Sequence, residues 1–228
     1  MKTVAFLPCR KGSERVPNKN IRDFAGITGG LLFIKLEQLL KSKRIDEIIL
    51  SSNDAQVFEI GASFKNEKIV PVIRPDHLGL SSTSTDDLIA YAAELIPDGT
   101  ILWTHVTSPF ITTELYDQII DKYYAVLHHF DSLMSVSPIK KFIWNEAGAI
   151  NYDRKSEKWP RTQTLKPLYE VNSGVFMANR SIYKQHKDRI GNHVFLYELS
   201  GKESFDIDWQ EDFDMAELIY TTNKKQLK

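Results

Sequence analysis

Short apolar runs alternate with amphipathic segments along most of this chain, and this alternation limits the possible folds more than any other property of the sequence. Apolar runs at 4–7, 48–50, 69–73 and 101–104 are typical of buried strands. Residues 31–40 between the first two runs have apolar side chains at helical spacing. Strands and helices that alternate at this spacing predict a parallel, doubly wound α/β sheet.

The same patterns continue toward the C-terminus. Further helices are expected at 55–64, 85–96, 114–127, 181–189 and 211–220, and further strands at 132–136 and 169–178. The 228 residues are enough for one domain with a substantial core, so we expect a single domain over 1–228.

Composition narrows the class of protein. Hydrophobic residues make up 42% of the chain, charged residues 26%, and the net charge is -1, so no bias toward nucleic acid or a membrane is expected. No apolar run approaches the roughly 20 residues of a membrane span, and no signal peptide is recognisable. Cys9 is the only cysteine, which excludes an intrachain disulfide and favours a cytoplasmic protein with Cys9 packed in the core.

One segment departs from the alternation. Residues 139–168 contain Phe142, Trp144 and Trp159 around a polar run, which predicts a hairpin and a long excursion from the sheet. Long loops inside a compact domain usually have a function or contact a partner. A disordered surface loop is the alternative, but the aromatic side chains favour burial.

A basic loop follows the first predicted strand. Residues 10–22 contain five cations and one acidic residue, Glu14, although the whole chain is nearly neutral. A loop with small residues and free backbone N–H groups at the carboxyl end of a strand suits a polyphosphate. The alternative is a solvated basic turn, which is common for a loop rich in arginine and lysine. The loop matches neither the GxxxxGK[ST] nor the GxGxxG pattern.

Residues 7–20, LPCRKGSERVPNKN, resemble the signature of the acylneuraminate cytidylyltransferases, (I/L)PAR-x-GSK-x-(I/L)P-x-KN. The resemblance extends over five motifs from Thr3 to about Glu217. It implies a Rossmann-like, mostly parallel sheet of the nucleotide-diphospho-sugar transferase type, with 139–168 as a protruding arm that forms a homodimer. It also implies an enzyme that couples CTP to a sialic-acid-like 2-keto sugar acid and releases pyrophosphate. Glu14 departs from the signature, which has a lysine there.

The resemblance assigns nucleotide-binding roles to ten residues. They are Arg10, Gly12, Ser13, Arg15, Lys19, Asn20, Arg74, Ser84, Thr85 and His105. Arg10 and Lys19 are also expected to assist catalysis on the side of the leaving pyrophosphate. Ser84 and Thr85 precede a predicted helix, so a helix cap is the alternative for this turn. His105 replaces the glutamine that reads the cytosine ring in the family, and an imidazole can also hydrogen-bond to a pyrimidine.

The sugar side is assigned to a second set of residues, Thr107, Ser108, Arg161, Gln163 and Asn172. Arg161 suits a sugar carboxylate because a guanidinium pairs with a carboxylate in a bidentate fork. Glu170 stands where some relatives carry an arginine, so another sugar acid, of the legionaminic, pseudaminic or Kdo type, is an open alternative.

Asp206 and Asp208 lie one residue apart in the most acidic stretch of the chain. On an extended segment this spacing places both carboxylates on one face, where they can hold Mg²⁺ or another divalent cation. The resemblance to the family's D-x-D motif supports this role and makes Asp208 a catalytic candidate. A helix start that merely favours negative charge is the alternative, and a catalytically silent nucleotide-sugar binding module is the alternative for the whole chain.

Overall fold

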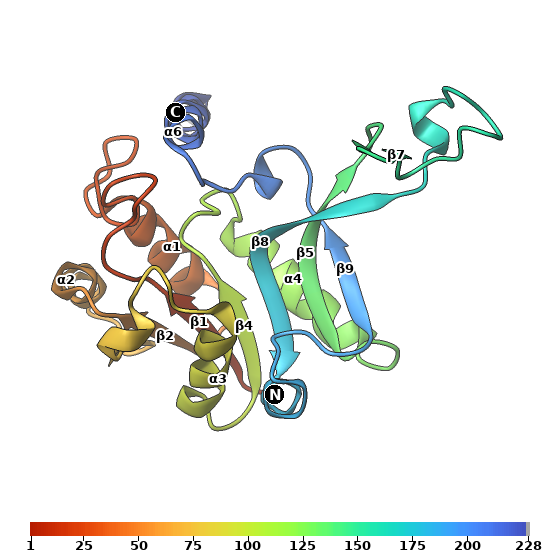
Figure 1. Cartoon of the computed structure of the whole chain (residues 1–228). Helices are drawn as coiled ribbons and strands as arrows, with labels where there is room; N and C mark the ends of the chain where they lie inside the picture. Colours follow the sequence, from red (N-terminus) through yellow and green to blue (C-terminus); the bar gives the residue numbers. More distant parts are fainter. Residues whose placement is uncertain (227–228) are drawn as a thin grey trace.

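The computed structural model describes residues 1–226, which form a seven-stranded sheet covered by helices on both faces (Figure 1). The strands are β1 (Thr3–Pro8), β2 (Glu47–Ser52), β3 (Ile69–Ile73), β4 (Thr100–Thr104), β5 (Ser132–Ile139), β8 (Leu168–Asn179) and β9 (Val194–Glu198). Their order is β3-β2-β1-β4-β8-β5-β9, and only β8 runs antiparallel to its neighbours. The predicted doubly wound, mostly parallel sheet is confirmed.

Six α-helices are described in this range. They are α1 (Gly30–Lys41), α2 (Ala55–Ser63), α3 (Thr85–Leu95), α4 (Thr113–Val126), α5 (Arg180–His186) and α6 (Gln210–Gln226). Three short 3₁₀ turns are η1 (Asp76–Leu78), η2 (Thr162–Thr164) and η3 (Gly201–Ser204). β9 was not predicted, although the apolar run at 194–197 is a strand signal, and α6 extends beyond its predicted end at residue 220.

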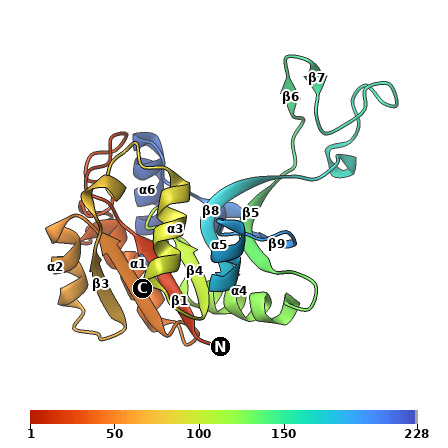
Figure 2. The ribbon, with the colours of Figure 1, turned by 60° about the horizontal axis from the view of Figure 1, so that its bottom comes forward.

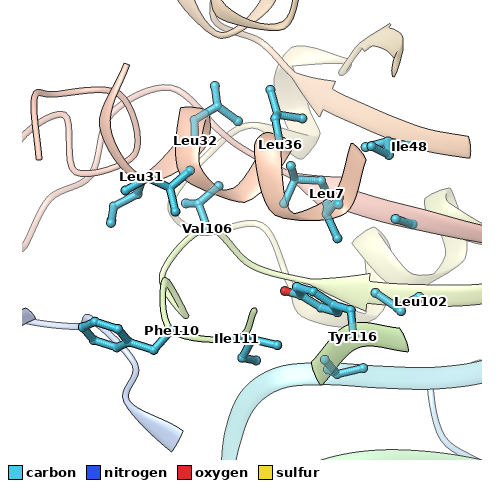
Figure 3. Packing of buried hydrophobic residues seen from close by; sticks show 14 of the residues in the cluster. Leu7, Leu31, Leu32, Leu36, Ile48, Leu102, Val106, Phe110, Ile111 and Tyr116 are labelled. Carbon is cyan, nitrogen blue, oxygen red and sulfur yellow. The ribbon is translucent and has the colours of Figure 1, made fainter. Parts of the chain in front are cut away.

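The two faces of the sheet bury different side chains. Along β1, Ala5 and Leu7 pack with one cluster, which includes α1, α4 and α6, whereas Val4 and Phe6 pack with the other, which includes α3 and α5. Figure 3 shows the first cluster, where Leu36 of α1 lies beside Leu7 of β1. Because central parallel strands are buried on both faces, β1 reads as a continuous apolar run.

Residues 139–168 leave the sheet between β5 and β8, as predicted, and project from the body as an arm (Figure 2). The arm contains a short hairpin, β6 (Trp144–Asn145) and β7 (Gly148–Ala149). The buried Asn151 side chain ties its base together, accepting from the Ile143 N–H at 3.0 Å and donating to the Lys141 carbonyl at 2.8 Å.

Aromatic side chains pack against one another within the arm. Phe142 contacts Tyr152 and Trp159 with ring centroids 5.1 Å and 5.5 Å apart. Trp144 and Trp159 are nevertheless 44% and 62% exposed. An exposed aromatic patch of this kind is typical of a contact surface, and its use in a homodimer stays a prediction. Within residues 1–226, no helix is long and apolar enough to cross a membrane.

Candidate active site

A cavity of about 440 Å³ lies where the loops that follow β1, β3 and β4 meet. It opens at the carboxyl ends of these parallel strands, which is the edge where α/β sheets bind ligands. Its lining residues are Pro8, Arg10, Ser13, Glu14, Arg15, Val16, Lys19, Asn20, Arg74, Ser81, Leu88, His105, Val106 and Thr107. The structure therefore brings seven of the ten predicted nucleotide-binding residues to one cavity, together with Thr107 from the sugar set.

The loop after β1 is held by its own hydrogen bonds and by one to Asn53, which follows β2. Arg10 donates to the Gly12 carbonyl at 2.9 Å, and the Asn20 amide donates to the Arg10 carbonyl at 3.3 Å. Gly12 has a φ of +67°, a left-handed conformation that favours glycine. The Lys11 N–H donates to the Asn53 side chain at 2.8 Å. These contacts fold the loop so that Arg10 and Ser13 line the cavity.

Arg74 contributes a buried cation. Its side chain is 3% exposed and donates to the carbonyl oxygen of Ser51 at 2.7 Å. Burial lowers the pKa of this guanidinium, but an arginine stays protonated in practice. Within residues 1–226 the Arg74 guanidinium forms no salt bridge. An anionic ligand is therefore a suitable partner for its charge.

Lys19 connects the basic loop with the acidic segment before α6. The side chain is 8% exposed, and its ammonium group donates to the Ile207 carbonyl. Burial lowers the pKa of Lys19, while the negative charges of Asp208 and Asp206 oppose this shift. The predicted leaving-group cation and the predicted metal ligands are thus electrostatic neighbours.

Asp206 and Asp208 flank Ile207, whose N–H donates to the Thr107 carbonyl at 3.0 Å. Burial raises the pKa of Asp206, and hydrogen bonding to the Thr107 side chain partly opposes this effect. One carboxylate oxygen of Asp206, Oδ1, is buried without a hydrogen-bond partner. Asp208 Oδ1 instead accepts from Arg15 Nη2 at 2.8 Å. A buried oxygen without a partner beside a second carboxylate fits a hard cation such as Mg²⁺.

No group of three or more His, Cys, Asp or Glu side chains that could hold a metal ion occurs within the described part of the chain. Two carboxylates alone suit an ion that keeps water and takes phosphate oxygens as further ligands, which is the usual coordination of Mg²⁺. The alternative role in starting α6 belongs to Asp212, whose Oδ2 accepts from the N–H groups of Asp208 and Trp209 at 3.0 Å and 2.8 Å.

His105 lies at the end of β4, half-buried in the wall of the cavity. Burial, and then the positive charge of Arg189, lower the pKa of His105 to about 3. Its Nε2 accepts a hydrogen bond of 2.9 Å from the indole N–H of Trp103. The ring is therefore neutral near pH 7 and can hydrogen-bond to a base without adding charge.

Several predicted site residues lie away from the cavity. Ser84 caps α3, accepting from the Asp87 N–H at 3.0 Å, as the alternative for this turn proposed, and Ser81 lines the cavity instead. Ser108 is buried, and its carbonyl accepts from Lys35. Gly12 and Thr85 are likewise not among the lining residues.

The remaining sugar-side residues belong to the arm and its base. Arg161 and Gln163 are exposed, and Gln163 lines a separate cavity of about 340 Å³ at the foot of the arm. Asn172 is 7% exposed and bridges β8 to β5 through Ser135 and Ser137, at 2.7 Å and 3.1 Å. Within one copy of the chain, these residues do not meet the nucleotide cavity, and their roles stay predictions.

Sequence reasoning missed Lys35, a fully buried lysine of α1. Its ammonium group donates to the Ser108 carbonyl at 2.8 Å and to the Tyr116 hydroxyl at 2.6 Å. Burial lowers its pKa to about 7, which the negative charge of Asp206 partly opposes. The signal was available, because Lys35 interrupts the apolar face at 31–40.

Cys9 is fully buried at the end of β1, and burial raises the pKa of its thiol to about 12. A buried thiol that stays protonated is inert as a nucleophile. The prediction that Cys9 is a packing residue is confirmed.

A doubly wound sheet with a basic loop, a buried arginine and paired carboxylates at its carboxyl edge defines a nucleotidyltransferase type of enzyme. Residues 4–228 match the sequence model of a family described as Cytidylyltransferase. The chain belongs to this cytidylyltransferase family, as its resemblance to the acylneuraminate cytidylyltransferases predicted.

Relatives cover the chain almost completely. A pseudaminic acid cytidylyltransferase of Campylobacter jejuni is 26% identical over 98% of both chains. A CMP-N,N'-diacetyllegionaminic acid synthase of Legionella pneumophila is 26% identical over the full length of both. An N-acylneuraminate cytidylyltransferase of Escherichia coli is 25% identical over 99% of this chain but only 54% of its own length.

Solved structures show the same fold. A CMP:2-keto-3-deoxy-manno-octonic acid synthetase complexed with CTP has a TM-score of 0.69 at 14% identity and covers 98% of this chain and 100% of its own. A 4-diphosphocytidyl-2C-methyl-D-erythritol synthase of Anaerococcus prevotii has a TM-score of 0.67 at 14% identity, with 96% of both chains covered.

Proposed function

We propose that this enzyme transfers a CMP group from CTP to the anomeric hydroxyl of a sialic-acid-like 2-keto sugar acid. The hydroxyl oxygen attacks the α-phosphorus, the bond from this phosphorus to the bridging oxygen breaks, pyrophosphate leaves, and the hydroxyl proton passes to water. The observation that carries the proposal is that Lys19 and His105 line one cavity, while the negative charges of Asp208 and Asp206, which are not lining residues, act on Lys19.

The chain's own residues would act mainly through position and charge. Arg10, Arg15 and Lys19 line the cavity, where they can neutralise the triphosphate and the leaving pyrophosphate. Mg²⁺, held by Asp206 and Asp208, would neutralise charge on the reacting phosphoryl group. Glu14 lines the same cavity, and Arg15 beside it supplies the cation that the family signature has at position 14.

We also propose that the arm completes the sugar site across a homodimer. Arg161 and Gln163 belong to an arm that projects from the body, so their predicted contacts with the sugar acid require a second copy of the chain (Figure 2). The exposed Trp144 and Trp159 supply an apolar surface for that contact.

The relatives differ in the sugar acid that their names give as substrate. The named substrates of the relatives include pseudaminic and N,N'-diacetyllegionaminic acids as well as N-acylneuraminate. A legionaminic or pseudaminic acid is therefore as well supported as a sialic acid.

A pyrophosphate-release assay tests the proposal. The common nucleoside triphosphates are each combined with a panel of eight- and nine-carbon 2-keto sugar acids in the presence of Mg²⁺. We expect release with CTP and at least one nine-carbon acid, and none when the acid is omitted. Absence of release with every pair would refute the proposed reaction.

A further inference from the structure

Trp103 and His105 form a hydrogen-bonded pair behind the cavity. Trp103 belongs to β4 and His105 follows its last residue, so the two side chains lie on the same side of the extended chain. The indole N–H donates to His105 Nε2 at 2.9 Å. His105 lines the cavity, whereas Trp103 is 1% exposed and does not. The imidazole is thus reached from the protein side by Trp103 and from the cavity side by a ligand.

The chemistry of the pair decides where the histidine proton lies. An indole nitrogen can only donate a hydrogen bond, so Nε2 of His105 must accept and carry no proton. A neutral imidazole carries one proton, so with Nε2 unprotonated the proton of His105 lies on Nδ1, which can donate a hydrogen bond. This leaves Nδ1–H as the polar group that the ring can offer to a ligand.

Packing prevents Trp103 from turning away. Phe6 meets its ring edge-on at a centroid distance of 4.7 Å. The Arg189 guanidinium lies 5.3 Å from the Trp103 ring and 3.6 Å from the Phe176 ring. The charge of Arg189, after burial, is also the main cause that keeps His105 neutral. An imidazolium would donate from both nitrogens and lose the Trp103 hydrogen bond.

We propose that Trp103 is a positioning residue for base recognition, which fixes His105 as a donor through Nδ1 and thereby selects cytosine over uracil. The discriminating atom is N3 of the pyrimidine, which accepts a hydrogen bond in cytosine and donates one in uracil. A Nδ1–H donor satisfies the first and opposes the second. This inference rests on the proposed function, because it places the nucleotide base against His105.

The tautomer can be measured without any substrate. In protein labelled with ¹⁵N-histidine, the nitrogen shifts and their couplings to the ring protons distinguish Nδ1–H from Nε2–H. The assignment of His105 comes from the spectrum of His105→Gln, in which its signals are missing. We expect Nδ1 protonated and Nε2 unprotonated at pH 7 in the wild-type protein. A wild-type spectrum with the proton on Nε2 overturns the inference.

Selectivity is measured as the ratio of the Kd values for UTP and CTP, by calorimetry without a sugar acid. Trp103→Phe keeps an aromatic ring and removes the N–H, so this ratio should fall by about tenfold. Phe6→Leu, which loosens packing on the same indole but leaves its N–H, is the matched control and should keep the wild-type ratio and tautomer. An unchanged ratio in Trp103→Phe overturns the inference.

Two variants at His105 provide a test if Trp103→Phe does not fold. In His105→Gln the amide carbonyl can accept from Trp103 while the amino group still donates to N3, so the preference for CTP should persist. His105→Leu offers no donor, and its preference should disappear. If His105→Leu keeps the preference, the inference is wrong. Binding and the spectrum are independent of turnover, so their failure is distinguishable from failure of the proposed transfer to a sugar acid.

Discussion

Arg15 Nη2 lies 2.8 Å from Asp208 Oδ1, and this ion pair joins the loop after β1 to the segment before α6. Both side chains are about half exposed, so the pair contributes less than about 1 kcal/mol to stability. The Arg15 guanidinium also lies 5.1 Å from the Trp209 ring. In the proposed reaction, Asp208 would exchange Arg15 for the metal ion, and Arg15 would turn to the phosphates.

Asp208→Asn keeps the shape of the side chain but removes its charge. We expect turnover to fall by a few orders of magnitude, which corresponds to about 1.4 kcal/mol of activation free energy per factor of ten. The midpoint of urea unfolding should change little, because the side chain is half exposed and its ion pair with Arg15 contributes little to stability. Pyrophosphate release at limiting and saturating Mg²⁺ is the measurement.

The matched control is Asp214→Asn, which makes the same chemical change in α6, where the exposed Asp214 accepts a hydrogen bond of 2.6 Å from the Gln210 amide. It should keep wild-type turnover and Mg²⁺ dependence. Near-normal turnover of both Asp206→Asn and Asp208→Asn at limiting Mg²⁺ would show that the pair holds no metal.

Because Lys35 is buried, the stability of the folded protein should depend on pH. Burial lowers the Lys35 pKa from 10.5 to about 7 in the folded protein, so between these pH values the unfolded chain binds the extra proton. Stability therefore rises with pH across this window, by up to about 1.4 kcal/mol per pH unit. Urea unfolding between pH 7.5 and 9.5 should show the wild type gaining stability relative to Lys35→Met.

Lys41→Met provides the comparison, since Lys41 lies in the same helix with its side chain 63% exposed and paired with Glu37. Its difference from the wild type should stay constant over the same pH range. Parallel curves for Lys35→Met and the wild type would mean that Lys35 is charged in the folded protein.

If the arm forms the proposed homodimer, the association state of the protein should depend on its exposed aromatic side chains. Sedimentation should show a dimer at micromolar concentration, and Trp159→Ser should shift it toward monomer by removing an exposed ring. Trp209→Ser changes a tryptophan of similar exposure, 57% against 62%, in another part of the chain and should leave the dimer intact. A monomeric wild type at that concentration contradicts the prediction.

The position of Gly30 should tolerate no side chain. Its φ is +54°, and a Cβ built there would lie 1.9 Å from the Arg22 carbonyl oxygen. Gly30→Ala should therefore cost more than about 3 kcal/mol of unfolding free energy. Gly201→Ala has a similar φ of +59° but open space around it, so only the backbone term of about 1–2 kcal/mol applies. Equal unfolding midpoints for the two variants would show that the loop around Arg22 gives way.

The sequence predicted most of the sheet because buried parallel strands are apolar throughout, and it predicted the basic loop because Arg10 and Lys19 lie within one short segment. It could not predict that Ser81 rather than Ser84 lines the cavity, since every hydroxyl in that turn suits a helix cap equally well. Trp103 and Lys35 were missed for another reason. Each lies inside an apolar run, and only the packed structure shows which polar group meets its nitrogen.

The antiparallel direction of β8 determines the edge of the sheet at which the arm begins. Thr104, the last residue of β4, pairs with Val175, so the earlier residues of β8 extend beyond the carboxyl end of β4. Chain entering β8 must therefore arrive at the edge that holds the cavity. A strand of the usual direction in this slot would receive its incoming chain at the opposite edge. Because this one strand is reversed, the arm begins on the side of the molecule that holds the cavity, and the pairing of Ile139 with Leu168 fixes the register at its base.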